Sequence, residues 1–231
     1  MPVRPGARIL VLRAADHRVT EIPDIAKLKW NLLFSRIENS PVVYDLWLDK
    51  YMSMFSESDL PVLDLGCGSG NNTKYLDERG VKVISSDYSE AALGKVSKDV
   101  PTARIVLHDM RNPLPFSDGC TKCVIADLSL HYFPMELTRK ILNEIDRILI
   151  PGGLFIFRVN SIHDKNYGAG VGKELEKNYF LHQGARKRFF DEETLDSIID
   201  GRWETVNRLE TEVNRYGKPK IAWEVALRKK C

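Results

Sequence analysis

From Leu60 onward, the chain alternates between short apolar runs and stretches whose apolar residues recur at helical spacing. Ser89 and Gly80 stand where a helix N-cap and a helix C-cap are expected. We predict buried strands over 61–65, 81–85, 104–107, 122–126 and 154–159, and helices over 71–79, 89–98, 134–149 and 192–199. Strands that alternate with helices of this length predict a parallel sheet with helices on both faces.

The last segment has a different pattern. Residues 203–213 and 220–227 each alternate apolar and polar side chains, with the turn residues Gly217 and Pro219 between them. Two strands joined by so short a connection run antiparallel. We therefore predict a doubly wound α/β sheet that ends in an antiparallel hairpin.

An aromatic stretch precedes the first strand. Tyr44, Trp47, Leu48, Tyr51 and Phe55 fall at i, i+3, i+4, i+7 and i+11, which is one face of a helix. Such a stripe is typical of core packing, and it also suits a lid that lines a substrate pocket, with Trp47 as a candidate substrate contact. We divide the chain into an N-terminal extension over 1–20, a helical cap over 21–56 and an α/β domain over 57–231.

Composition narrows the class of protein. The 231 residues are 43% hydrophobic and 29% charged, as in ordinary globular domains. A net charge of +2, from 34 basic and 32 acidic residues, argues against a nucleic-acid scaffold. No apolar run approaches the roughly 20 residues that span a bilayer. We expect a cytoplasmic protein without a membrane segment, and we interpret the Arg-rich start as a loosely packed extension or an organelle transit peptide.

Cysteine usage predicts no metal site. Cys120 and Cys123 form a lone C-x-x-C, and no second Cys or His pair stands at the spacing that zinc requires. The pair leads into a predicted strand, whereas a redox pair is expected at the start of a helix. We interpret both as incidental thiols in a reducing compartment.

A glycine-rich turn follows the first predicted strand and opens a helix. Glycines at this point let the backbone approach a ligand, and the free N–H groups of the helix start suit a negatively charged group. The spacing is G-x-G-x-G, whereas the dinucleotide fingerprint is G-x-G-x-x-G. The candidate cofactor-binding residues of the turn are Asp64, Gly66, Cys67, Gly68, Gly70 and Asn71.

Two acids accompany this turn. Asp64 precedes the first glycine by two residues, where its carboxylate can face a ligand ammonium group. Asp87 closes the second predicted strand, 17 residues after Gly70, where an acid can accept hydrogen bonds from both hydroxyls of a ribose. The pattern indicates a nucleoside ligand that also carries an amino group.

Residues 60–160 resemble a class I methyltransferase dependent on S-adenosylmethionine (SAM). The resemblance rests on the glycine turn, on Asp87, and on the stretches 108–118, 127–133 and 148–154. It implies that Asp87 binds the ribose, Tyr88 packs beside the adenine, Asp109 contacts the exocyclic amine and Met110 contacts the ring. It also implies that Asp127 is a cofactor-binding residue and that the loop beginning at Asp127 borders the methyl group. The implied fold is Rossmann-like with seven strands, mostly parallel, with an antiparallel C-terminal strand.

Methyl transfer from a sulfonium relies mainly on alignment, so a base is needed only when the acceptor keeps a proton. His131 and Tyr132, in the loop after the fourth strand, are the candidate catalytic residues. A lone His among aromatic residues is usually a packing residue, which is the alternative to a catalytic base. A test is His131→Ala, because unchanged single-turnover methyl transfer would exclude a role as base.

Two later segments are candidates for the acceptor site. The stretch 160–172 carries three glycines and Tyr167, which suits either a mobile loop over the pocket or a plain surface loop. The cluster 186–190 places Arg188 and two further basic residues beside aromatics. It suits either an anionic acceptor group or a solvated run of charge.

The sequence therefore predicts an enzyme that transfers a methyl group from SAM to a small molecule and releases S-adenosylhomocysteine. We expect a monomer or homodimer. We also expect no binding to nucleic acid, because the loop after the fourth strand lacks the Asn/Asp-Pro-Pro-aromatic stretch of amino-methylating DNA enzymes. Three alternatives stay open: an NAD-dependent oxidoreductase, a non-catalytic module that binds SAM or S-adenosylhomocysteine, and a methyltransferase that acts on protein or RNA.

Overall fold

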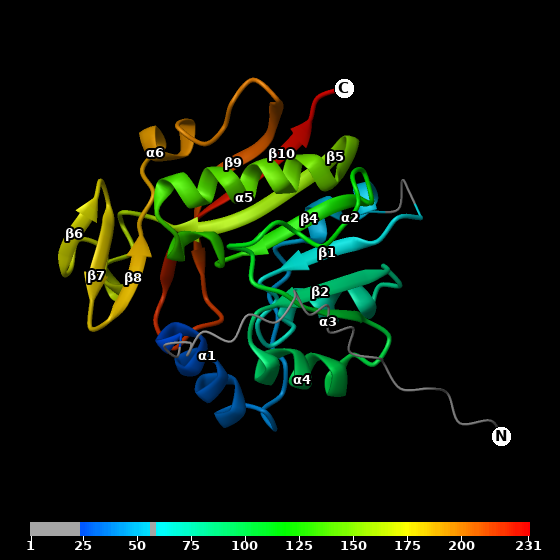
Figure 1. Cartoon of the computed structure of the whole chain (residues 1–231), viewed down its shortest axis with the longest axis horizontal. Helices are drawn as coiled ribbons and strands as arrows, with labels where there is room; N and C mark the ends of the chain where they lie inside the picture. Colours follow the sequence, from blue (N-terminus) through cyan, green and yellow to red (C-terminus); the bar gives the residue numbers. More distant parts are fainter. Residues whose placement is uncertain (1–23, 56–58) are drawn as a thin grey trace, which may run out of the picture.

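A seven-stranded sheet forms the centre of the molecule (Figure 1). The computed structural model describes residues 24–55 and 59–231, so the predicted extension over 1–20 lies outside the described residues. The strands, in their order across the sheet, are β3 Arg104–Leu107, β2 Val83–Asp87, β1 Val62–Leu65, β4 Thr121–Asp127, β5 Leu149–Asn160, β10 Lys220–Lys229 and β9 Trp203–Val213.

Strand directions follow the prediction. Strands β1 to β5 pair in parallel. Strand β10 pairs antiparallel with both β5 and β9, so it alone within this sheet runs against the others. The predicted mostly parallel sheet with an antiparallel C-terminal strand is confirmed.

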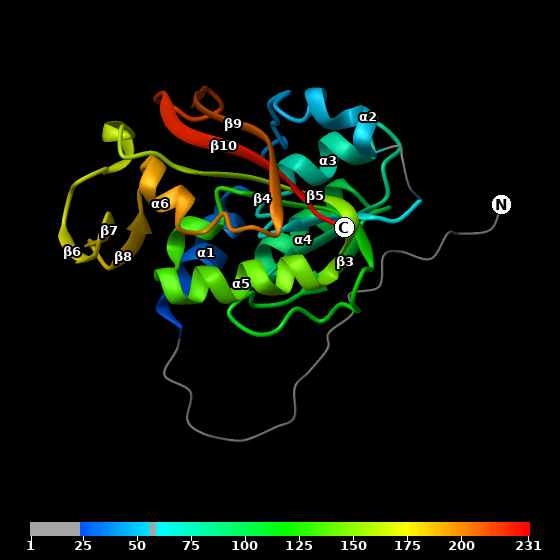
Figure 2. The same ribbon diagram turned by 90° about the horizontal axis from the view of Figure 1, so that it is seen from above.

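Helices cover both faces of the sheet (Figure 2). Their bounds are α1 Ile25–Arg36, η1 Asp49–Tyr51, α2 Met52–Phe55, α3 Asn71–Asp77, α4 Glu90–Asp99, η2 Leu130–Tyr132, α5 Met135–Ile148, η3 Lys165–Tyr167 and α6 Glu192–Asp196. On one face, α5 packs Ile141, Leu142 and Ile145 against β1, β4 and β5. On the other, α2, α3 and α4 cover the same sheet. Within the described part of the chain, no helix is long and apolar enough to cross a bilayer.

The direction of the strands determines where polar side chains gather. The carboxyl ends of β1, β2, β4 and β5 lie at one edge of the sheet, because these strands are parallel. The first residues of β10 lie at the same edge, because that strand is antiparallel to β5. Ligands of open α/β sheets bind at this edge.

The predicted aromatic helix is only partly present. Helix α1 ends at Arg36, no helix is formed over 37–48, and helical structure resumes at η1. Pro41, which has no N–H and a fixed φ, stands in this interval and disfavours a continuous helix. The stripe is nonetheless core, because Trp47, Tyr51 and Phe55 are buried against β1 and α3. The helical spacing therefore predicted the burial correctly and the helix over 44–48 wrongly.

A second, three-stranded sheet follows β5 and was not predicted. It consists of β6 Lys173–Glu176, β7 Tyr179–His182 and β8 Ala185–Arg188, in the order β6-β7-β8. Positive φ angles at Gln183 (48°) and Gly184 (73°) form the tight turn between β7 and β8. Strand β8 contacts η2, so this small sheet stands beside the carboxyl end of β4.

Candidate active site

The glycine turn between β1 and α3 requires glycine for two separate reasons. Gly66, Gly68 and Gly70 have φ angles of 74°, 53° and 84°, which L side chains rarely adopt. In addition, a Cβ on Gly66 would lie 2.6 Å from the Cβ of Ser129, and one on Gly70 would lie 2.9 Å from Val96. The turn is therefore shaped by backbone geometry and close packing together.

Asp64 presents a buried carboxyl group at this turn. It is 1% exposed, and its Oδ2 accepts a hydrogen bond of 2.7 Å from the Thr73 hydroxyl. Its Oδ1 has no hydrogen-bond partner among the described residues. Burial raises the pKa of Asp64 to about 7, although the Thr73 hydrogen bond lowers it in part. A buried carboxyl with an open oxygen suits a cationic group such as an ammonium.

Asp87 lies on the other side of the turn. Its Oδ2 accepts a hydrogen bond of 2.9 Å from the Gly68 N–H, and its Oδ1 accepts one of 2.9 Å from the Ser89 N–H. Burial raises the pKa of the Cys67 thiol, and the charges of Asp87 and Asp64 raise it further. Asp64 stands in β1 before the turn, and Asp87 at the end of β2 is bonded to the turn through the Gly68 N–H.

Helix α1 covers the turn from outside. The Phe34 ring lies 3.3 Å from the position that a Cβ on Gly68 would take. Trp30 stacks on Phe34 at 5.6 Å and meets Tyr132 edge-on at 5.5 Å. Asn31 of the same helix accepts a hydrogen bond of 2.6 Å from the hydroxyl of the N-cap Ser89 of α4. Three side chains of the N-terminal segment thus reach the site.

The residues expected around an adenine also lie at this edge. The Met110 methyl group lies 3.1 Å from the position of a Cβ on Gly66. Asp109 accepts hydrogen bonds from the Arg111 backbone N–H (2.9 Å) and from its Nε (2.7 Å). Arg111 also pairs with Asp24, the N-cap of α1, so the Asp109 carboxylate is tied to that helix. Tyr88 is half-buried, and burial together with nearby Asp24 raises its pKa.

A buried ion-pair network surrounds Asp127 at the end of β4. Arg158 donates to Asp127 through Nε (2.7 Å) and Nη2 (2.9 Å), and Arg215 donates to it at 2.7 Å. Both arginines also donate to Asp45, at 2.6 Å from Arg158 and 3.3 Å from Arg215. We call Asp45, Asp127, Arg158 and Arg215 the arginine–aspartate quartet. Burial raises the pKa of Asp127, but the two arginines outweigh it and hold the pKa well below its usual range.

Sequence reasoning proposed Asp127 and did not find the other three members of the quartet. Arg158 carried a signal, because a charge inside the apolar run of β5 must be paired when it is buried. Arg215, between β9 and β10, and Asp45, in the N-terminal segment, carried none. Their partners lie 88 and 113 positions away in sequence.

The N-terminal segment is docked on α3 beside this quartet. The Trp47 indole N–H donates to Asn72 at 3.0 Å, and the Arg158 guanidinium lies 4.1 Å above the Trp47 ring. The Asn71 amide donates to the Val43 carbonyl. Trp47, a predicted substrate contact, therefore lies next to the predicted cofactor residues and is largely covered.

The two catalytic candidates differ in surroundings. His131 is 2% exposed, and its Nδ1 has no partner among the described residues. Burial lowers the pKa of His131 well below its usual range, and nearby Lys220 and Lys187 lower it further, so the ring is neutral at pH 7. Burial raises the pKa of the Tyr132 phenol, which is therefore protonated.

The two remaining substrate candidates occupy different positions. Tyr167 in η3 donates to the Lys218 carbonyl at 3.0 Å, and the Lys220 ammonium lies 4.5 Å from its ring centre. Arg188 lies inside the small sheet, where it donates to the Lys177 carbonyl at 2.8 Å and pairs with Glu176. Arg188 thus has internal partners, whereas Tyr167 stands near the edge where β5 ends.

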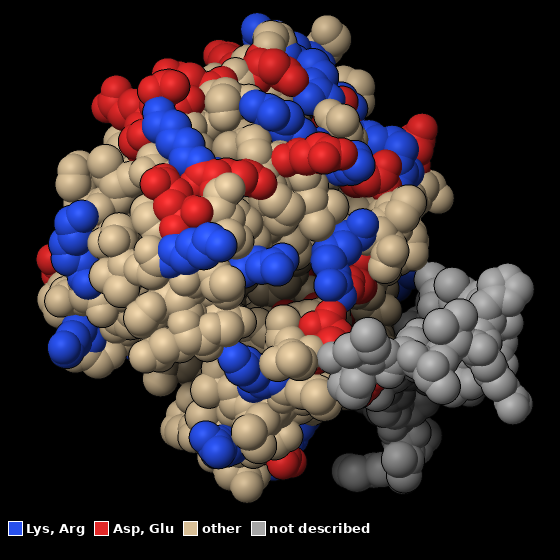
Figure 3. All heavy atoms as spheres, turned by 60° about the vertical axis from the view of Figure 1, so that its left-hand side comes forward, with Lys and Arg blue, Asp and Glu red and all other residues tan. Residues whose placement is uncertain are grey.

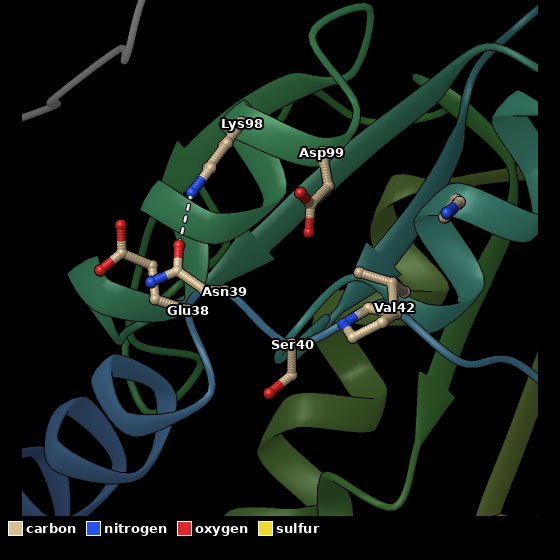
Figure 4. Close-up of a pocket in the computed structure, with 8 residues that line it drawn as sticks. Glu38, Asn39, Ser40, Val42, Lys98 and Asp99 are labelled. Atoms are coloured by element: carbon tan, nitrogen blue, oxygen red, sulfur yellow. Dashed lines mark hydrogen bonds between the residues drawn. The ribbon is translucent and has the colours of Figure 1, made fainter.

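Two hollows on the surface lie elsewhere. One, of about 240 Å³, is lined by residues 38–42, Lys74, Lys98 and Asp99, and the last two stand at the end of α4 opposite the Ser89 cap (Figure 4). The other, of about 370 Å³, is lined by four carboxylates, Ile162, His163 and Trp223. Neither includes Asp64 or Asp87. In the described part of the chain, no group of three or more His, Cys, Asp or Glu side chains could hold a metal.

Comparison with known proteins agrees with this geometry. Residues 63–157 match the family described as methyltransferase domain. An uncharacterised methyltransferase of Synechocystis sp. is 37% identical over 94 residues, which cover 41% of this chain and 44% of that protein. A tRNA N(3)-cytidine methyltransferase of Gallus gallus is 27% identical over 157 residues, which cover 62% of this chain and 42% of that protein. Each match thus spans less than half of the relative's length.

Solved structures share the fold. A SAM-dependent methyltransferase of Methanosarcina mazei has a TM-score of 0.67 at 20% identity, covering 78% of this chain and 97% of that chain. The strand order, the glycine turn with its two acids, and the match over residues 63–157 agree with one another. Residues 63–157 are thus similar to a methyltransferase domain, and the chain shares its fold with SAM-dependent methyltransferases of known structure.

Proposed function

We propose that this protein binds SAM at the glycine turn and transfers its methyl group to a small molecule. The observation that carries the proposal is the pair of acids at neighbouring strand ends, Asp64 and Asp87, on either side of a turn that only glycines can form. SAM, when bound, supplies a methyl group already activated on a sulfonium.

The residues present fit this ligand. The open Oδ1 of Asp64 suits the ammonium of the methionine moiety. The Asp87 carboxylate, which accepts two backbone N–H bonds, stands where ribose hydroxyls are bound in sheets of this kind. Tyr88 and Met110 supply apolar surface for the adenine, and Asp109 supplies an acceptor for its amine. Cys67 and Asn71 belong to the backbone that approaches the ligand.

Catalysis in this proposal rests on alignment. The loop after β4 carries His131 and Tyr132, whose ring centres are 4.3 Å apart, and in this proposal it borders the methyl group of the cofactor. A buried neutral imidazole accepts a proton without first losing one, so His131 is the stronger candidate for a base. Alignment alone supplies much of the rate when the acceptor is already deprotonated.

Calorimetry with SAM tests the cofactor assignment. We expect binding to the wild-type chain and at least about a hundredfold weaker binding to Asp87→Ala, because that residue contributes charge-assisted hydrogen bonds. Gly80→Ala, at a glycine with open space around it, is the matched control and retains affinity. An acceptor screen that follows release of S-adenosylhomocysteine then tests turnover. No release with any acceptor would favour a non-catalytic binding module.

RNA is the second candidate acceptor, because one relative is named as a tRNA methyltransferase. The charge of this chain argues against an RNA acceptor. The net charge is +2, and Lys and Arg lie interspersed with Asp and Glu over the face seen in Figure 3. Binding to phosphates weakens steeply with salt. If the protein binds tRNA tightly and the affinity falls at least tenfold between about 50 and 200 mM salt, RNA is the methyl acceptor in place of a small molecule.

A further inference from the structure

Polar side chains without partners gather where β4 and β5 end. Asn160, the last residue of β5, is 0% exposed, and His131 in η2 is 2% exposed. Both side-chain amide atoms of Asn160 and the Nδ1 of His131 lack a hydrogen-bond partner among the described residues. Folded proteins satisfy nearly all buried polar atoms, so three such atoms together point to a ligand.

Two lysines come from the elements around these atoms, and one of them is paired with a carboxylate. Lys220, at the start of β10, donates to Asp164 at 2.7 Å, and both side chains are buried. Lys187 in β8 is half-buried and makes no ion pair within residues 24–55 and 59–231. Burial lowers the pKa of Lys187, and only Asp164 opposes this. Asp164 is paired with Lys220, so Lys187 adds a second ammonium group without a carboxylate of its own.

Nearby charges do not balance this excess. Asp127 also acts on Lys220 and His131, but it is already held by the two arginines of the quartet. His131 is neutral, because burial and the two lysines lower its pKa. The group formed by His131, Asn160, Asp164, Lys187 and Lys220 thus carries a net charge of about +1. We call this group the basic cluster.

The sheet brings the cluster together from distant positions. Strand β5 lies between β4 and β10, and Asn160 stands directly opposite Ala222. Lys220 precedes Ala222 by two residues, so it is the diagonal neighbour of Asn160 on the same face. Strand β8, which contributes Lys187, contacts η2, which contributes His131. The small sheet therefore forms one side of the cluster, beside the carboxyl end of β4 (Figure 1).

We propose that the methyl acceptor is a small monocarboxylic acid whose carboxylate binds the basic cluster, held by Lys187 and Lys220 and by the Asn160 amide. This inference rests on the proposed function and specifies its substrate. A carboxylate has the single negative charge that the cluster lacks. A phosphate monoester, with a charge of about −1.5 to −2, would leave an excess of buried negative charge.

The cluster is too far from the cofactor residues to serve the methionine carboxylate of SAM. Asp64 lies in β1, and β4 lies between β1 and β5 in the sheet. Adjacent strands are about 4.8 Å apart, so the end of β5 is about 10 Å from the end of β1. The loop after β4, with Tyr132, lies between them. A molecule held at Asn160 is therefore on the far side of that loop, where an acceptor belongs.

Thermal denaturation of the full chain, saturated with S-adenosylhomocysteine, tests the proposal. The probes are a series of straight-chain monocarboxylates from propionate to octanoate, benzoate, the matched primary amides and inorganic phosphate. We expect at least one carboxylate to raise Tm in a concentration-dependent way while its amide and phosphate do not. Lys187→Met is expected to weaken that carboxylate at least about tenfold, since one hydrogen bond to a charged group is lost. Lys173→Met, at an exposed lysine of the same small sheet, retains full affinity.

Asn160→Leu separates binding from folding. It removes two unpartnered polar atoms, so its Tm without carboxylate is expected to equal or exceed that of the wild type, while carboxylate binding is lost. Equal shifts by acid and amide, a stronger shift by phosphate, or full binding by Lys187→Met would overturn the proposal. Calorimetry with SAM on the same variants keeps the two hypotheses apart. Normal SAM binding without carboxylate binding rejects only the acceptor, and absent SAM binding rejects the proposed function.

Discussion

The two halves of the candidate site are built in different ways. On the cofactor side, the ends of β1 and β2 are linked by local contacts, such as the bond between Gly68 and Asp87, 19 positions apart. At the ends of β4 and β5, the quartet links Asp45 to Arg158 and Arg215 across 113 and 170 positions. The first half depends on backbone shape, and the second depends on buried charges that meet only in the folded chain. We therefore expect mutations in the two halves to fail for different reasons.

The largest effect is expected in the quartet. Arg158→Met leaves Asp127 and Asp45 with Arg215 as their only partner in the quartet, so buried negative charge goes uncompensated. We expect a loss of about 3–5 kcal/mol in the free energy of unfolding, measured by urea denaturation. Arg139→Met, at an exposed arginine of α5, is the control and stays within about 0.5 kcal/mol. A loss below 1 kcal/mol for Arg158→Met, on the scale of an exposed pair, would mean that the quartet is not a unit.

Asp64 gives the cofactor side a pH dependence. Its pKa is about 7 in the folded chain, against an ordinary value of 3.8, because burial disfavours the charge. Below pH 3.8 the carboxyl is neutral in both states, and as pH rises to 7 the unfolded chain ionises first, so stability falls. Asp64→Asn, which cannot ionise, is expected to remove this fall, a difference of at most about 4 kcal/mol at pH 8.

The affinity for SAM is expected to change with pH in the opposite direction to the stability of the free protein. An ammonium beside Asp64 favours the ionised carboxyl, so we expect SAM affinity to rise as pH increases through 7. Calorimetry between about pH 5.5 and 8.5, which spans the pKa of Asp64, measures the affinity for SAM. A flat profile in Asp64→Asn and a rising one in the wild type would support contact with the ammonium. Equal profiles in both proteins would exclude Asp64 as the ammonium ligand.

Two glycines isolate the contribution of packing. Gly66 and Gly80 both have a φ of 74°, but a Cβ on Gly66 meets Ser129 at 2.6 Å, whereas nothing lies within 4 Å of one on Gly80. Backbone strain destabilises both Ala variants, and only Gly66→Ala also overpacks its surroundings. We expect Gly66→Ala to be less stable than Gly80→Ala by about 1–3 kcal/mol in urea denaturation. Equal losses would mean that φ alone determines the cost of alanine in the turn.

What the sequence could predict follows the same division. The strands, the hairpin and the glycine turn were predicted because apolar runs, turn residues and glycine spacing are local signals. The helix over 44–48 was wrong because helical spacing reports burial, and an irregular segment held by Trp47 and Asn72 buries the same side chains. The small sheet was missed because its strands have only four residues each and two of them, β6 and β8, are mostly polar, with β6 exposed throughout.

The candidate site divides likewise. Asp64 and Asp87 do flank one turn, as their spacing indicated. Arg215 and Asp45 gave no signal, because an ion pair between distant positions leaves no periodic pattern in a single sequence. The role of the basic run at 186–190 at an acceptor site stays a prediction. The structure separates its members, with Arg188 paired inside the small sheet and Lys187 left beside Asn160 and His131.

The smallest effect is expected from an exposed ion pair on the cofactor side. Arg111 joins Asp109 to Asp24 and is 47% exposed, so water and salt screen both pairs. We expect Arg111→Met to lower the free energy of unfolding by less than about 1 kcal/mol, and the difference to vanish at 1 M salt. SAM affinity is expected to change by less than about threefold. The variant weakens only the contact that holds α1 over the site, and the glycine turn stays intact. Asp109→Asn is the matched variant, and a larger loss of SAM affinity there than in Arg111→Met would mean that Asp109 contacts the ligand itself. If Arg111→Met costs as much as Arg158→Met, burial does not distinguish the two halves, and the quartet has no special place in the fold.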